Sequence, residues 1–222
     1  MPDASVVILI VVLLFSVVVH EVAHGWSADK MGDPTARNQG RLTLNPIMHI
    51  DLFWTILLPL ILYLSAGLLF GGAKPVPVNP YNFKNPKKGM AISAAAGPLS
   101  NLILAVIGII VFKIVMIFGV YDQFVNNFIA HFVFINLVLM SFNLLPIPPL
   151  DGSKVLMGFM SYRSAAKYES MSQYGFFIII GLILIGDLTK VSIFSYMLIP
   201  IMYFLFFVDP MLYQVVITNV FK

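Results

Sequence analysis

The sequence predicts an all-α polytopic membrane protein with about five to six transmembrane helices. Of its 222 residues, 59% are hydrophobic and only 10% are charged, whereas a soluble domain carries about 25% charged residues. The mean hydropathy is +0.93. The apolar residues fall in long runs rather than scattered over many short elements, and runs of this length match the thickness of a bilayer.

The elements follow from the order of these runs. The expected helices cover residues 5–27, 89–120, 124–145, 171–186 and 191–208. The apolar segment 52–70 contains Pro59 and either spans the membrane or enters it and returns. The turn-rich segment 71–86 has four prolines, so its "KPVPV" portion should be extended, and "RLTLN" at 41–45 could form a short strand. No hydrophilic stretch is long enough for a second domain, so residues 1–222 are interpreted as a single domain.

Charge and cysteine content exclude several classes of protein. The net charge is +3, and no basic patch with interleaved aromatic residues indicates nucleic-acid binding. With no cysteine, disulfides and cysteine-bound metals are ruled out. The first apolar run follows "MPDAS", which lacks lysine and arginine, so we expect a retained helix rather than a signal peptide.

The "HEVAH" motif at residues 20–24 places ionisable side chains in the first helix. His20 and His24 lie one turn apart on one face, so both imidazoles can reach a zinc ion at about 2.0–2.1 Å. Glu21 between them can take a proton from a metal-activated water. Polar residues facing the bundle interior are the alternative. An ionisable residue at membrane depth costs about 2.5–3.5 kcal/mol on insertion scales, which favours a functional role.

A third protein ligand is needed if a water is to hold the fourth zinc position. His49 and His131 are possible, but Asp151 is favoured because "PIPPLDGS" at 146–153 breaks a membrane helix. Non-helical backbone at that depth is tolerated where it is buried in protein or lines a wet cavity. An ordinary Asp-Gly turn remains the alternative for Asp151. Asn143, in the preceding apolar helix, needs a polar partner.

These paired motifs resemble the site-two proteases, a family of intramembrane zinc metalloproteases. "GRLTLNP", "GGAKPVPVNP" and "AGPLSN" also resemble segments of its compact bacterial and archaeal members, without the PDZ or CBS domains of larger relatives. The resemblance implies one zinc ion bound by His20, His24 and Asp151, with Glu21 as general base. It implies that Asn143 holds the substrate or its oxyanion, and that the protein lies in a bacterial or archaeal cell membrane.

The expected substrate is a transmembrane segment of another protein. A helix must unwind before cleavage, and an extended segment could then pair with it by strand addition. The substrate-binding candidates are Gly71, Gly72, Val76, Val78 and Asn136, and Asn136 shares a helix face with Asn143 and could support the site. A plain connecting loop is the alternative for the extended segments. Asn101 and Asn136 are expected to form interhelical hydrogen bonds, and Gly97 to serve helix packing.

Lysine and arginine counts bear on orientation. If residues 52–70 cross the membrane, the basic residues divide eight against five, and if the segment is re-entrant they divide eleven against two. The second arrangement also brings the ends of helices 5–27 and 124–145 to one side, and predicts an active site facing the cytosol.

Two other function classes compete with an intramembrane endopeptidase. A membrane zinc transporter would need ligands repeated through the membrane depth, and an inert protease-like scaffold would usually have lost a ligand or the glutamate. The predicted partners are a transmembrane protein substrate and the lipid bilayer, and the oligomeric state is left open.

Overall fold

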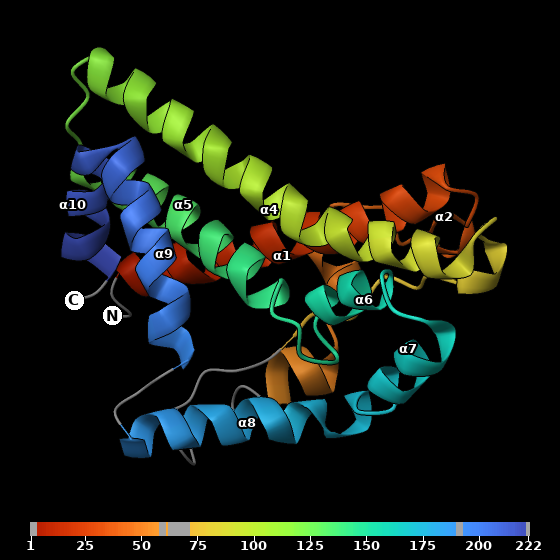
Figure 1. Cartoon of the computed structure of the whole chain (residues 1–222). Coiled ribbons are helices and arrows are strands. Elements are labelled where there is room, and N and C mark those ends of the chain that lie inside the picture. The colour runs from red at the N-terminus through yellow and green to blue at the C-terminus, as the bar shows by residue number, and fades with distance from the viewer. Residues whose placement is uncertain (1–3, 58–60, 62–71, 190–192, 221–222) are drawn as a thin grey trace.

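The computed structural model describes residues 4–57, 61, 72–189 and 193–220, and within these residues it contains helices and no strand (Figure 1). The α-helices are α1 (Ala4–Lys30), α2 (Thr35–Asn38), α4 (Pro86–Ile117), α5 (Gln123–Asn143), α6 (Asp151–Met157), α7 (Tyr162–Glu169), α8 (Ser172–Thr189), α9 (Ile193–Val208) and α10 (Pro210–Val220). Short 3-10 turns form at η1 (Pro46–His49) and η3 (Pro80–Asn82), and a π-helical turn forms at η2 (Leu52–Leu57). The all-α class is confirmed.

Three helices in the described part of the chain are long and apolar enough to cross a membrane, namely α1 from Val7, α4 and α5. They match the predicted helices 5–27, 89–120 and 124–145 to within three residues at each end. Helices α8 and α9 form where 171–186 and 191–208 were predicted, but the apolar helix found there, Tyr196–Val208, is shorter than a span. The predicted count of five to six spans is therefore not confirmed.

Local signals fix the ends of the spanning helices. Pro86 occupies the first turn of α4, and the Asn85 side chain before it accepts a hydrogen bond from Lys88 N at 3.0 Å. Asp122 caps α5 in the same way, accepting from Val125 N at 2.9 Å. Gly119 has φ +68° just beyond α4, a backbone conformation that glycine adopts without steric cost. These residues place α4 and α5 in a tight hairpin.

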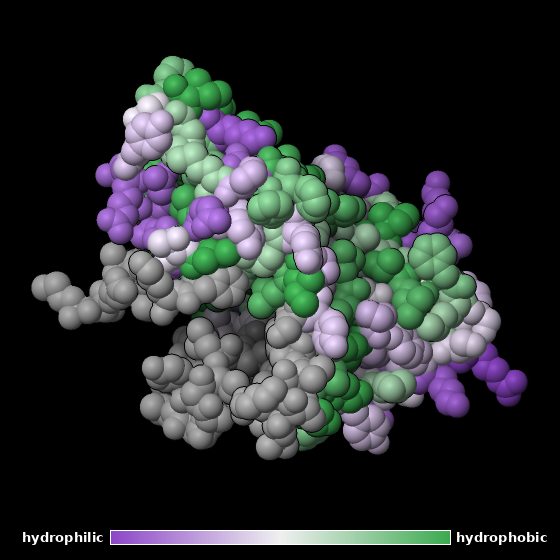
Figure 2. Space-filling model, turned by 60° about the vertical axis from the view of Figure 1, so that its left-hand side comes forward, coloured by the Kyte–Doolittle hydropathy of each residue, from purple (hydrophilic) through white to green (hydrophobic). Residues whose placement is uncertain are grey.

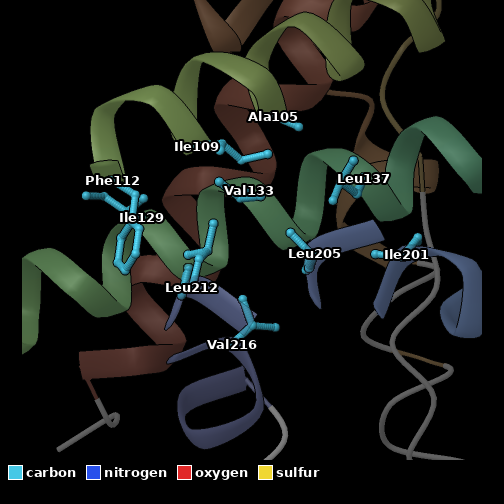
Figure 3. Close-up of a cluster of buried hydrophobic side chains, with 11 residues drawn as sticks. Ala105, Ile109, Phe112, Ile129, Val133, Leu137, Ile201, Leu205, Leu212 and Val216 are labelled. Atoms are coloured by element: carbon cyan, nitrogen blue, oxygen red, sulfur yellow. The ribbon is translucent and has the colours of Figure 1, made fainter. Parts of the chain in front are cut away.

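Helix α4 runs along one side of the bundle and packs against α1, α5 and α6 (Figure 1). A hydrophobic cluster joins α4 and α5 to α9 and α10 (Figure 3). Its buried members are Ala105, Ile109, Phe112, Ile129, Ala130, Val133, Leu137, Ile201, Leu205, Leu212 and Val216. This cluster holds the end of the bundle where the α4–α5 hairpin turns.

The outer face of α4 is apolar and exposed. Ile103, Ile107, Ile110 and Ile114 are each between 47% and 59% exposed, and their spacing places them in one stripe along the helix. Figure 2 shows hydrophobic residues gathered between more hydrophilic margins on the face that it presents. Soluble monomers rarely expose large continuous apolar patches, so the stripe is what a lipid-facing surface requires.

The connection between α1 and α4 begins and ends at the same end of the bundle. Asp33, just after α1, is fully buried. Its carboxylate accepts hydrogen bonds from Asn79 N at 2.6 Å and from the Asn82 side-chain amide at 2.7 Å. The C-terminal end of α1 and the N-terminal end of α4 therefore lie on one side. The course of most of 52–70 lies outside the described residues.

The predicted β segment is not formed within the described residues. Residues 72–79 and the "RLTLN" segment run without regular structure. Lys74 N donates to the His49 carbonyl at 2.8 Å, but Val76 N donates to the Glu21 carboxylate at 2.9 Å and Arg41 donates to the Lys74 carbonyl at 3.0 Å. Since prolines 75 and 77 lack an N–H, side chains take the place that a neighbouring strand would fill.

Candidate metal centre

His20 and His24 project from one face of α1 toward a common point. Their Nε2 atoms are 3.0 Å apart, and the two rings stand nearly perpendicular, with an interplanar angle of 86°. The His20 side chain is 7% exposed and the His24 side chain 12%. One helical turn between them thus gives the shared site that the "HEVAH" spacing predicts.

Asp151 reaches the same point from the start of α6. Its Oδ2 lies 3.1 Å from His20 Nε2 and 3.2 Å from His24 Nε2. The next residue, Gly152, allows this approach, because a Cβ there would stand 2.2 Å from the Leu144 carbonyl oxygen. A glycine after Asp151 therefore lets α6 fold back against the end of α5.

The electrostatic setting keeps Asp151 ionised. Burial raises the pKa of this carboxyl, but the neighbouring imidazoles of His20 and His24 and the positive charge of Lys154 lower it, and the net pKa lies below its ordinary value. The Lys154 ammonium is 3.8 Å from Asp151 Oδ1. A carboxylate, rather than a carboxylic acid, is the form that binds a metal.

The three residues fit zinc. Their ligand atoms all lie within 4.8 Å of one another. Zinc bonds of 2.0–2.1 Å in a tetrahedron place neighbouring ligand atoms about 3.3 Å apart, and the three separations here are 3.0, 3.1 and 3.2 Å. Two imidazoles and one carboxylate leave the fourth tetrahedral position for water or substrate.

Groups behind the imidazoles hold the rings in place. His20 Nδ1 is 2.6 Å from Asn101 Oδ1, and His24 Nδ1 is 2.7 Å from the Ser93 carbonyl oxygen. Each ring nitrogen that faces away from the centre therefore meets an acceptor, which leaves Nε2 to face the centre. Such partners fix ring orientation and raise the basicity of a metal ligand.

Gly97 of α4 lies against both rings. A Cβ at this position would stand 2.4 Å from His24 Nε2 and 2.6 Å from His20 Nε2. We expected Gly97 to serve helix packing alone, and its contact with the centre was missed. Gly97 precedes Asn101 by one helical turn and shares its face, but no spacing in the sequence links either residue to His20.

Glu21 lies beside the centre on α1 and is half-buried. Its Oε2 accepts a hydrogen bond from Val76 N at 2.9 Å. Val76 in turn packs its side chain onto α1 near Gly25, whose hypothetical Cβ would stand 2.6 Å from Val76 Cγ1. The extended segment 72–79 is thereby fixed next to the glutamate.

The other predicted site residues do not belong to the cluster of three metal ligands. Asn143 lies at the end of α5, and its amide donates to the Leu139 carbonyl at 3.0 Å. Gly72 is exposed and its carbonyl accepts from Thr55 Oγ1 at 2.7 Å. Val78 is half-buried in the extended segment. Gly71 lies outside the described residues.

Asn136 is fully enclosed, with 0% of its surface exposed. It donates to Ser16 Oγ at 2.9 Å and accepts from Asn101 Nδ2 at 2.9 Å. These bonds to α1 and α4 are the interhelical contacts expected of Asn136, and its part in substrate binding stays a prediction. His49 and His131, the other ligand candidates, bind the Thr43 and Asn127 carbonyls and lie outside the cluster.

Comparisons with known proteins show the family of this chain. The model of peptidase family M50 matches residues 8–128 and 113–186. YwhC of Bacillus subtilis is 42% identical over 175 residues, which cover 77% of this chain and 77% of YwhC. Rip2 of Mycolicibacterium smegmatis is 27% identical over 184 residues, 80% of this chain and 66% of Rip2. MJ0611 of Methanocaldococcus jannaschii is 40% identical over 102 residues, 44% of this chain and 50% of MJ0611.

Each of these relatives bears the name "Putative zinc metalloprotease". No solved structure matches the chain. The family, the names and the three apolar helices support a zinc-dependent metalloprotease in a membrane. The chain belongs to peptidase family M50, the site-two protease family, and is an integral membrane protein.

Proposed function

We propose that this protein is a zinc endopeptidase that hydrolyses peptide bonds within or near transmembrane segments of other proteins. The observation that carries the proposal is the convergence of His20, His24 and Asp151 within 4.8 Å, with Glu21 beside them on α1. The ligands come from the C-terminal half of one spanning helix and from just beyond the end of another, so the reaction would take place close to the membrane.

Glu21 would act as the general base. Zinc held by His20, His24 and Asp151 would supply a Lewis acid that activates water and polarises the scissile carbonyl. A Glu21 carboxylate oxygen would take the proton from the attacking water and then deliver it to the leaving amine. Glu21 Oε2 accepts the hydrogen bond from Val76 N, so the other carboxylate oxygen would take the proton.

Asn143 would help to hold the substrate or its developing oxyanion. Its amide has two N–H donors, and the bond to Leu139 uses one of them. Gly71, Gly72, Val76 and Val78 would line the path of an unwound substrate. This role is supported by the position of Val76 beside Glu21, at 2.9 Å from N to Oε2.

The active site would face the cytosol. Residues 31–85 start and finish at the same end of the bundle, which supports a re-entrant segment 52–70. Seven of the thirteen basic residues lie between Lys30 and Lys88, in this connection and at the helix ends that it joins. The positive-inside rule would assign such an end to the cytosol.

A zinc transporter and an inert scaffold are less well supported. Among the described residues one cluster offers three metal ligands, whereas a transport path needs ligands at several depths. An inert scaffold is disfavoured because all three ligands and Glu21 are present and close together.

The test is cleavage of a model transmembrane substrate by purified protein in detergent or vesicles. We expect the wild type to cut it and Glu21→Gln, loaded with the same amount of zinc, to lose nearly all activity. Equal cleavage by the two proteins at equal zinc content would overturn the proposed function.

A further inference from the structure

A continuous chain of buried polar side chains leads from His20 into the bundle. Asn101 Oδ1 is 2.6 Å from His20 Nδ1, Asn101 Nδ2 donates to Asn136 Oδ1 at 2.9 Å, and Asn136 Nδ2 donates to Ser16 Oγ at 2.9 Å. Ser16, Asn101 and Asn136 are each 0% exposed and come from α1, α4 and α5, respectively. Each of the three helices that are long enough to span in the described part of the chain thus contributes one member.

Two backbone carbonyls determine which way the side-chain amides of Asn101 and Asn136 are turned. Asn136 Nδ2 also donates to the Phe132 carbonyl at 2.8 Å, and Asn101 Nδ2 lies 3.4 Å from the Ser16 carbonyl oxygen. A backbone carbonyl can only accept a hydrogen bond. If either amide were turned over, its oxygen would face a carbonyl oxygen in a dry interior, where an unsatisfied polar group is costly. The amide nitrogens must therefore face the carbonyls.

The direction of the amides determines the tautomer of His20. With Asn101 Nδ2 turned toward the Ser16 carbonyl, Asn101 presents Oδ1, an acceptor, to His20 Nδ1. A neutral imidazole has one donor and one acceptor nitrogen. Nδ1 then carries the hydrogen, and Nε2 keeps the lone pair that faces His24 and Asp151.

We propose that the Phe132 and Ser16 carbonyls, acting through Asn136 and Asn101, set His20 in the tautomer that binds zinc. Asn136 is then a positioning residue that acts two hydrogen bonds away from the imidazole. His24 needs no such relay, because its Nδ1 faces the Ser93 carbonyl directly at 2.7 Å. The inference rests on the proposed zinc site.

The test compares zinc affinities of the full chain in detergent, measured by competition with a chelator. Asn136→Leu removes the bonds to Phe132, Ser16 and Asn101, and should weaken zinc binding about 10- to 100-fold, as the loss of partners behind a metal ligand does. Ser16→Ala removes a hydroxyl but leaves the Phe132 carbonyl in place, so its effect should be smaller than that of Asn136→Leu. A larger loss of zinc affinity in Asn136→Leu than in Ser16→Ala would support orientation through the Phe132 carbonyl over an effect of packing alone.

His131→Leu is the matched control. His131 lies on the same helix, is 4% exposed, and bonds to the carbonyl four residues earlier, as Asn136 does. Its hydrogen bond goes to the Asn127 carbonyl, and within the described residues it makes none to Ser16, Asn101 or Asn136. We expect His131→Leu to lower the melting temperature of the metal-free protein while keeping wild-type zinc affinity. Asn136→Leu should also reduce the rise in melting temperature that zinc produces.

A second measurement needs no variant. The chain has four histidines, so ¹⁵N spectra of the metal-free wild type can report the tautomer of His20. We expect the hydrogen on Nδ1. A hydrogen on Nε2, or equal zinc affinity in Asn136→Leu and the wild type, would overturn the inference and leave the proposed function standing. A wild type that binds no zinc would overturn both.

Discussion

Gly97→Ala adds one methyl group at the point where α4 touches both imidazoles. The added Cβ would stand 2.4 Å from His24 Nε2 and 2.6 Å from His20 Nε2. Ordinary contacts between such atoms are near 3.5 Å, so the rings or α4 would have to move by about 1 Å. The rings cannot withdraw freely, because Asn101 and the Ser93 carbonyl hold them from behind at 2.6 and 2.7 Å.

A displacement of this size is large on the scale of metal coordination. Ligand distances in zinc sites vary by about 0.2 Å, so a shift of about 1 Å removes at least one imidazole from the metal. Losing a partner behind a ligand already weakens metal binding about 10- to 100-fold. We therefore expect Gly97→Ala to bind zinc more than about 100-fold less tightly, with peptidase activity lost in parallel.

The assay is zinc affinity by chelator competition, with Gly181→Ala as control. Gly181 lies in α8, and a Cβ there would meet nothing within 4 Å. Replacing a helical glycine by alanine stabilises a helix by up to about 1 kcal/mol, so helix propensity favours both variants equally. Wild-type zinc affinity in Gly97→Ala would refute the geometry described for this site.

Three further outcomes follow from the structure. Gly152→Ala should lower stability by about 1–3 kcal/mol in thermal unfolding, because its Cβ would stand 2.2 Å from the Leu144 oxygen; an unchanged melting temperature would contradict this packing. Burial raises the pKa of Asp33, but hydrogen bonds from neighbouring groups outweigh it and hold the pKa below its ordinary value. Asp33 therefore stabilises the fold above the unfolded carboxyl pKa of about 3.9, and this is lost as pH falls through the folded pKa. Asp33→Asn should then cost about 1–3 kcal/mol at pH 7, with the gap to wild type closing in melts at lower pH. Val76→Pro removes the N–H that binds Glu21, so kcat should fall about tenfold or more at unchanged zinc content. Val76→Ala keeps this N–H and should lower kcat less than Val76→Pro does.

The part of the site that could be predicted consists of residues whose spacing along one helix puts them on the same face. The "HEVAH" interval places His20 and His24 on one face whatever the rest of the fold does. Asp151 was favoured because proline-rich backbone at a helix end needs an enclosed setting, and the structure brings its Oδ2 within 3.2 Å of both rings. The helix bounds were close for the same reason, since long apolar runs define them.

The missed part depends on contacts between distant segments. Asn101 and Asn136 were expected to pair between helices, but no spacing rule links either to His20, which lies 81 residues before Asn101. The "KPVPV" portion is non-helical as predicted, but it joins no strand because the Glu21 and Arg41 side chains bind its backbone instead. Helix α4 begins at Pro86 rather than residue 89 because Asn85 caps it, a signal weaker than the apolar run that follows.

The hydrogen bonds among Ser16, Asn101 and Asn136 also explain how helices with apolar faces reach one register, meaning one relative position along their axes. Apolar side chains have nearly the same free energy against lipid as against each other. Apolar packing alone therefore determines the relative axial position of membrane helices only weakly. Ser16, Asn101 and Asn136 come one from each spanning helix and bond to one another inside the bundle. Moving one helix by a single residue shifts it by about 1.5 Å, which would break these bonds and leave amides unsatisfied in a dry interior. The same three residues end at His20 Nδ1. The register of the three helices and the orientation of a metal ligand therefore depend on one set of hydrogen bonds, and a variant that relaxes the register should loosen zinc binding before it unfolds the bundle.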